Sequence, residues 1–178
     1  DIERELEEIV RRIKELIRRH KKRLEELVRE LEELLRRHRE ELKKLVKRAA
    51  ELVEELRRRN SRDETTLRRM REKLDRIRRE IEKSTKEVED ELDKLLKEVD
   101  TSHKELEDRV RELAKELERK NVDDTVKDML RKLLEEVKEA SDRAREKLTD
   151  ILRKIKKISE EVKREIDDIR KKIEDTAK

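Results

Sequence analysis

The chain has 178 residues, of which 60% are charged and 31% hydrophobic, and it contains no Gly, Pro, Cys, Phe, Tyr or Trp. Without cysteine there are no disulfides and no thiolate chemistry, and without Gly and Pro, about 12% of average chains, the usual turn-forming residues are missing. The formal net charge is +4, and the 55 basic and 51 acidic residues are interspersed, so the sequence shows no basic patch typical of nucleic-acid binding. It contains no run of about 18 apolar residues, which a membrane span needs, and no signal-peptide pattern.

The first predicted helix covers residues 2–60. So high a charge is also typical of disordered chains, but here the apolar residues recur at spacings of three and four, which places them on one face of a helix. They are Ile2, Leu6, Ile9, Ile13, Leu16, Leu24, Leu27, Leu31, Leu34, Leu42, Leu45, Ala49, Leu52 and Leu56. This stripe predicts a helix that packs one face into a core.

The first break lies at residues 60–64. Asn60 suits a helix C-terminus, and Ser61 with Glu64 three residues later forms a capping-box pattern. A second helix is therefore predicted over residues 62–120. Its core series is Leu74, Ile77, Ile81, Val88, Leu92, Leu95, Val99, Leu106, Val110, Leu113 and Leu117.

Two further cap-like patterns occur inside this second helix. Ser84 precedes Glu87 by three residues, and Ser102 precedes Glu105 by three. The core series runs past both without a change of phase, whereas a turn would reset the phase. We therefore expect no break at either place.

The second break follows Lys120, where Asn121 is followed by Asp123 and Asp124, acids that suit a first turn. It predicts a third helix over residues 123–177. The core of this helix is Val126, Leu130, Leu133, Val137, Ala144, Leu148, Ile151, Ile155, Ile158, Val162, Ile166, Ile169 and Ile173.

The polar residues within the stripes recur every 18 residues. His20 precedes His38 by 18, and Ser141 precedes Ser159 by 18. Eighteen residues make about five helical turns, so the repeat predicts straight helices, whereas a seven-residue repeat would impose a left-handed supercoil. Short loops make successive helices antiparallel. The expected fold is all-α: one straight, up-down-up, elongated three-helix bundle as a single domain, residues 1–178.

Folding the chain at the two breaks brings the polar residues to two levels. The first layer is predicted to contain His20, Ser102, His103 and Ser141, and the second layer His38, Ser84, Thr85 and Ser159. Ring nitrogens and hydroxyls satisfy one another, whereas each would be costly to bury alone. A slipped helix would leave them unpaired, so the layers are predicted to specify the register.

Imidazoles and hydroxyls can also bind metals, catalyse reactions or respond to pH. Zinc prefers three or four N, S or O ligands and serine is a poor one, so no metal or other cofactor is expected. His20 with Ser102 or Ser141 resembles a base and a nucleophile, but we expect no acidic residue to orient the imidazole, no oxyanion donor and no substrate pocket, and hence no enzyme. Buried neutral histidines would lose stability on acidification, so a pH response stays an alternative.

Across its whole length the chain resembles de novo designed, parametrically generated helical bundles with buried hydrogen-bond layers. The resemblance rests on the 18-residue repeat, the missing Gly, Pro and aromatic residues, and the layers His20/Ser102/Ser141 and His38/Ser84/Ser159. It implies a structural scaffold without natural biochemical activity, monomeric and needing no partner, nucleic acid or membrane. The alternatives are a self-assembling or partner-binding helical module and a natural structural coiled coil; spectrin-like bundles are the nearest natural comparison but normally carry aromatic core residues.

Overall fold

The computed structural model describes residues 2–59, 63–120 and 123–177. The described residues form three helices: α1 (Ile2–Arg58), α2 (Glu64–Glu118) and α3 (Asp124–Ala177). The all-α, three-helix prediction is confirmed. Each helix lies slightly inside its predicted range, as is usual where end turns fray.

An aspartate immediately precedes both the second and the third helix. The Oδ1 atom of Asp63 accepts a hydrogen bond from the backbone N–H of Thr66 at 2.8 Å, and Asp123 does the same for Val126 at 3.2 Å. Each carboxylate thus pairs one of the N–H groups that a helix start leaves without an internal partner. The predicted roles of Asn60, Ser61 and Asn121 lie outside the described residues.

The helix α2 runs without interruption through both internal cap-like patterns. Ser84 and Ser102 both lie within Glu64–Glu118. The expectation that the core series would override these local signals is confirmed, because capping hydroxyls compete with helix formation only where tertiary packing does not favour the helix.

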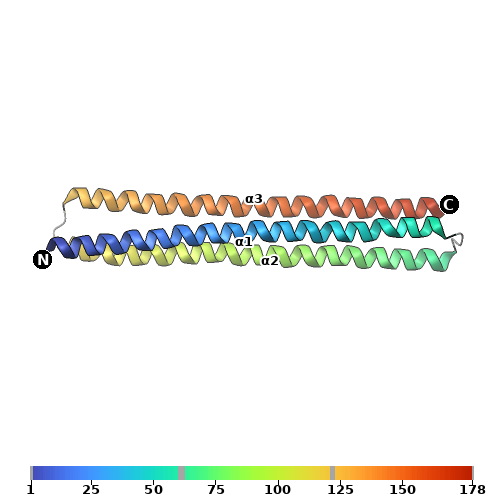
Figure 1. Ribbon diagram of the computed structural model, residues 1–178, viewed down its shortest axis with the longest axis horizontal. Coiled ribbons are helices and arrows are strands. Elements are labelled where there is room, and N and C mark those ends of the chain that lie inside the picture. The colour runs from blue at the N-terminus through green and yellow to red at the C-terminus, as the bar shows by residue number, and fades with distance from the viewer. Residues whose placement is uncertain (1, 60–62, 121–122, 178) are drawn as a thin grey trace. The chain divides into compact units, whose positions relative to one another are not determined.

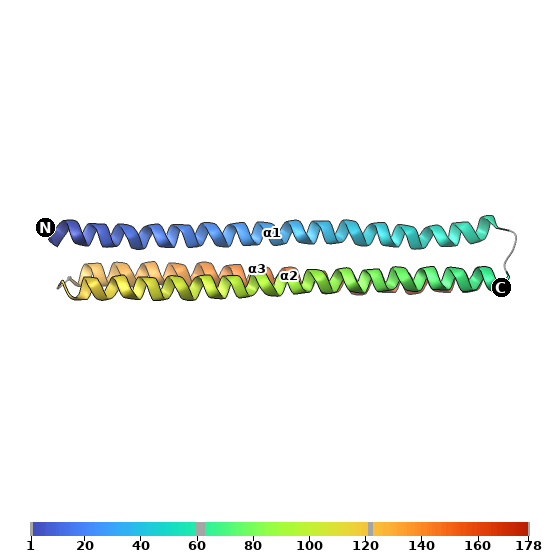
Figure 2. The same cartoon turned by 90° about the horizontal axis from the view of Figure 1, so that it is seen from below.

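The chain forms two compact units, each built from segments of all three helices lying side by side (Figures 1 and 2). The first unit comprises Asp1–Leu31 and Leu92–Thr149, and the second comprises Glu32–Glu91 and Asp150–Lys178. The single domain over residues 1–178 and the straightness of the helices stay predictions.

The first unit has an aliphatic core. Its most deeply buried members, Ile13, Val110 and Val137, are fully inaccessible and come one from each helix. Burying an aliphatic side chain of this size stabilises the folded state by about 1.5–3 kcal/mol. The core cluster contains Ile9, Ile13, Ile17, Leu106, Val110, Leu113, Leu117, Leu130 and Val137.

The second unit has a core of the same kind, in which Ala49, Ile81 and Ile166 are fully inaccessible. At its surface Arg71 of α2 pairs with Glu174 of α3 through two hydrogen bonds of 2.6 and 2.8 Å, and Arg78 pairs with Asp167. The partners on α3 recede as α2 advances, so the two segments run in opposite directions here. These ion pairs lie at the surface and are at least partly open to solvent, so each adds little stability, about 0–1 kcal/mol.

Among the described residues, no helix combines the length and the apolar character that crossing a membrane would require.

Candidate functional site

The first layer brings together side chains from all three helices of the first unit. His20 of α1 is 4% exposed, and Ser141 of α3 is fully inaccessible. The Nδ1 atom of His20 lies 2.9 Å from Ser102 Oγ on α2, and its Nε2 atom lies 3.0 Å from Ser141 Oγ. Ser141 Oγ also lies 2.8 Å from Nδ1 of His103, so one hydroxyl serves two imidazoles.

The contact between His103 and Glu107 fixes which atoms donate and which accept in these hydrogen bonds. Nε2 of His103 lies 2.8 Å from Oε1 of Glu107, and an ionised carboxylate only accepts. A neutral His103 therefore carries its hydrogen on Nε2 and accepts from Ser141 at Nδ1. Ser141, its single hydrogen thus used, accepts from Nε2–H of His20, and Ser102 donates to His20 Nδ1.

The first layer is thus one unbroken donor-to-acceptor chain from Ser102 through His20, Ser141 and His103 to Glu107. Every imidazole nitrogen in it has a partner. This full pairing offsets the cost of burying polar groups in an aliphatic core.

The second layer lies in the second unit and is less connected. Its four members are all buried: His38 1%, Ser84 6%, Thr85 8% and Ser159 3% exposed. Nδ1 of His38 lies 3.2 Å from Ser84 Oγ, and Ser84 donates to Glu41 Oε2 at 3.3 Å.

The other half of the second layer joins Thr85 and Ser159, whose hydroxyl oxygens lie 2.9 Å apart. Thr85 also donates to the backbone carbonyl of Ile81 at 2.8 Å. His38 and Ser159 belong to the same predicted layer, but no hydrogen bond joins them: Nε2 of His38 is buried and has no hydrogen-bond partner among the described residues. The second layer therefore consists of two separate groups of contacts, one around His38 and Ser84 and one around Thr85 and Ser159, because Ser159 bonds to Thr85.

Two carboxylates belong to these layers although the sequence argument expected no acidic residue there. Glu107 contacts His103, four residues earlier on the same helix, and Glu41 contacts Ser84, which itself contacts His38. The contact between His103 and Glu107 could have been predicted from their i,i+4 spacing, because residues so spaced are neighbours on a helix surface.

Ser141, His103 and Glu107 form a series of hydroxyl, imidazole and carboxylate, which resembles a nucleophile, a base and an orienting acid. The surroundings do not suit acyl transfer. Ser141 is fully inaccessible to solvent, and it lies within α3, where backbone N–H groups are used by the helix rather than free to bind an oxyanion. These contacts therefore link the helices through hydrogen bonds and do not present a reactive hydroxyl to a substrate.

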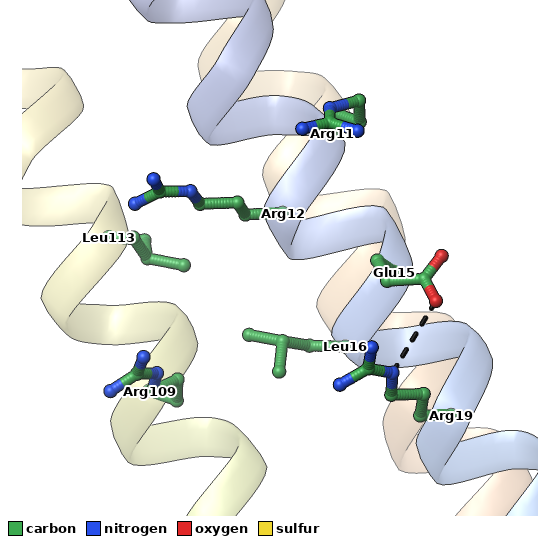
Figure 3. Close-up of a pocket in the computed structure, with 7 residues that line it drawn as sticks. All are labelled: Arg11, Arg12, Glu15, Leu16, Arg19, Arg109 and Leu113. Carbon is green, nitrogen blue, oxygen red and sulfur yellow. Dashed lines mark ion pairs between the residues drawn. The ribbon is translucent and has the colours of Figure 1, made fainter.

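A surface groove of the first unit lies between α1 and α2 (Figure 3). Leu16 and Leu113 form its apolar floor, and the guanidinium groups of Arg12 and Arg109 extend beside them. Its carboxylate, Glu15, is held by Arg18 at 2.8 Å and by Arg19 at 3.4 Å. The lining includes no hydroxyl, thiol or imidazole, and so no nucleophile or base of these types.

The described residues contain no group of three or more His, Cys, Asp or Glu side chains placed to hold a metal ion. The rings of His20 and His103 have centroids 6.1 Å apart and are tilted by 54°. All four of their nitrogens contact hydroxyl or carboxylate oxygens, so these imidazoles serve the hydrogen-bond chain.

Burial lowers the pKa of both buried histidines, His20 and His38. It lowers the pKa of His20 to about 4, and the electrostatic effects of His103 and Arg145 lower it by smaller amounts. Burial also lowers the pKa of His38, while the negative charge of Glu41 acts in the opposite direction. Both effects follow from the cost of holding a charge away from water.

No protein-family model matches this chain, and neither does any curated protein. Among solved structures, the chain is similar to one described as a computationally designed three helix bundle, with a TM-score of 0.55 and 19% sequence identity. The similarity covers 99% of this chain and 88% of the other. At this identity the likeness shows the three-helix-bundle fold, and it agrees with the resemblance to designed helical bundles.

Proposed function

We propose that this protein is a designed structural scaffold whose two polar layers specify how its helices align. The observation that supports this most directly is the donor-to-acceptor chain from Ser102 to Glu107, which draws on all three helices. An aliphatic core tolerates many alignments at similar cost, whereas hydrogen bonds need specific distances and angles.

A polar layer specifies the alignment by raising the free energy of misaligned states. On α3 the buried neighbours of Ser141 are Val137 and Ala144, about one turn away on either side. A slip of one turn would place His20 against a side chain that neither donates nor accepts hydrogen bonds. Leaving a buried polar group unpaired costs about 1–3 kcal/mol, so each polar layer disfavours such slips.

We further propose that the protein is a monomer and needs no cofactor, nucleic acid or membrane. The apolar stripes of the helices are largely buried within each unit, which supports this proposal. Among the described residues, Ile2 is the exposed large hydrophobic side chain. A large apolar patch would be expected on a surface that binds another chain.

The experiment replaces the whole first layer with apolar residues: His20→Leu, Ser102→Val, His103→Leu and Ser141→Val. Replacing buried polar groups together is often neutral or stabilising, so the guanidinium midpoint should stay or rise. The alignment should become heterogeneous, which spin labels at exposed positions of the first unit, Lys22 on α1 and Lys138 on α3, would report as a broadened distance distribution.

The matched control changes a purely aliphatic level of the same unit, with Ile13→Leu and Val110→Ile. That variant should keep a narrow distance distribution, because no hydrogen bond is removed. If the layer variant also stays narrow, the aliphatic packing alone sets the alignment, and the proposed role of the polar layer is wrong.

A further inference from the structure

The Nε2 atom of His38 is a buried polar atom that the described side chains leave without a hydrogen bond. His38 is 1% exposed, so bulk water does not reach the ring. The corresponding nitrogen of His20 is bonded to Ser141, so the environment of Nε2 differs between the two histidines. Buried polar groups in proteins nearly always have a partner, either protein or an internal water.

The contacts on the other side of the ring determine what Nε2 needs. Ser84 gives its hydrogen to the carboxylate of Glu41, so it can only accept from Nδ1–H of His38. A neutral His38 with its hydrogen on Nδ1 has a lone pair on Nε2. The atom therefore requires a donor.

Ser159 is also left with acceptor capacity. Thr85 gives its hydrogen to the carbonyl of Ile81, so Ser159 is the donor in their 2.9 Å contact. The oxygen of Ser159 retains lone pairs, but its hydrogen is used.

Ser159 occupies the position on α3 that should face this ring. It follows His38 at the same separation, 121 residues, as Ser141 follows His20, and in the first unit that separation gives a direct contact with Nε2. The second layer therefore holds two acceptors, Nε2 of His38 and Oγ of Ser159, with no hydrogen between them.

We propose that His38 and Ser159 together bind one internal water molecule, which donates one hydrogen to each. Water is the small ligand that supplies two hydrogens from one atom, and buried waters typically make about three hydrogen bonds to groups of this kind. Serine is smaller than its buried neighbours on α3, Ile155 and Val162, so its side chain occupies less volume at this level. A zinc ion would instead need three or four ligand atoms.

Nuclear magnetic resonance on the full chain labelled with 15N and 13C tests this at neutral pH. Long-range proton–nitrogen correlation should show the hydrogen of His38 on Nδ1. Cross-relaxation between water and the ring C–H protons should have the sign of a long-lived, bound water at His38.

His20 is the internal control. It contacts two serine hydroxyls, so any signal relayed through hydroxyl exchange with solvent would appear there as well. The proposal requires a markedly stronger water signal at His38 than at His20. Equal signals, or a hydrogen on Nε2 of His38, would overturn it.

The variant Ser159→Val removes one acceptor and fills the space with methyl groups. The water signal at His38 should disappear while the spectrum of the first unit stays unchanged. Persistence of the signal in the folded variant would show that Ser159 does not hold the water. If the variant does not fold, the wild-type comparison of His38 with His20 still decides the matter.

Discussion

Ser141 Oγ lies 3.0 Å from His20 Nε2, and this contact joins α3 to α1 within a unit whose core is otherwise largely aliphatic. The same oxygen reaches His103 on α2, so one hydroxyl links three helices. A residue with such a role should be more sensitive to substitution than its size implies.

Replacing Ser141 with Ala should lower the free energy of unfolding by about 1–3 kcal/mol, because it leaves a buried nitrogen of His20 and a partly buried nitrogen of His103 without partners. Guanidinium unfolding at about pH 7.5 measures this directly. Thr149→Ala, an exposed change on the same helix, is the control and should have little effect. A silent Ser141→Ala would contradict the assignment of a structural role to the hydrogen-bond chain.

Replacing Ser159 with Ala should cost less than replacing Ser141. Ser159 contacts one protein hydroxyl, that of Thr85, which keeps its bond to the carbonyl of Ile81. Denaturant midpoints of the two variants, measured side by side, give the comparison. An equal or larger loss for Ser159→Ala would mean that the second layer is as tightly coupled as the first.

Acidification should destabilise the protein through His20. Its pKa in the folded state is lowered from 6.5 to about 4, so the unfolded chain binds more protons between these values. Stability is therefore full above the unfolded pKa and is lost as the pH falls toward the folded pKa, by about 2 kcal/mol at about pH 5. Comparing guanidinium midpoints at about pH 7.5 and 5 measures the loss.

The variant His20→Leu identifies the group responsible. It should reduce the difference between the two midpoints, leaving the contribution of His38, whose pKa burial also lowers. Identical midpoints for the wild type at both pH values would exclude an acid response from buried histidines.

Light scattering on a size-exclusion column should give a molar mass near that of one chain, 21.9 kDa, at neutral pH. A monomer is expected because the large apolar side chains of the described residues are mostly covered within the units. A dimer or trimer would instead indicate that the chain is an assembly module, and the polar layers would then be candidates for selecting partners.

Much of this architecture follows from periodicity. The spacing of apolar residues located all three helices, and the unbroken phase through Ser84 and Ser102 correctly outweighed two cap-like patterns. The same spacing placed His20 and Ser141 at one level, where they lie in contact. The start of the second helix was located less accurately: the prediction relied on Ser61, which lies outside the described residues, whereas in the structure the carboxylate of Asp63 accepts a hydrogen bond from the first turn of α2.

By itself, therefore, the sequence determined which faces are buried and which polar residues share a level, because a helix repeats its geometry every 3.6 residues. Only the tertiary structure decided which atoms bond: that Glu107 completes the first layer, and that Ser159 bonds to Thr85 and leaves His38 Nε2 without a partner among the described side chains. The physical reason is one of scale. Periodicity places a side chain to within a turn of about 5.4 Å, whereas a hydrogen bond forms or fails over about 0.5 Å and depends on angle.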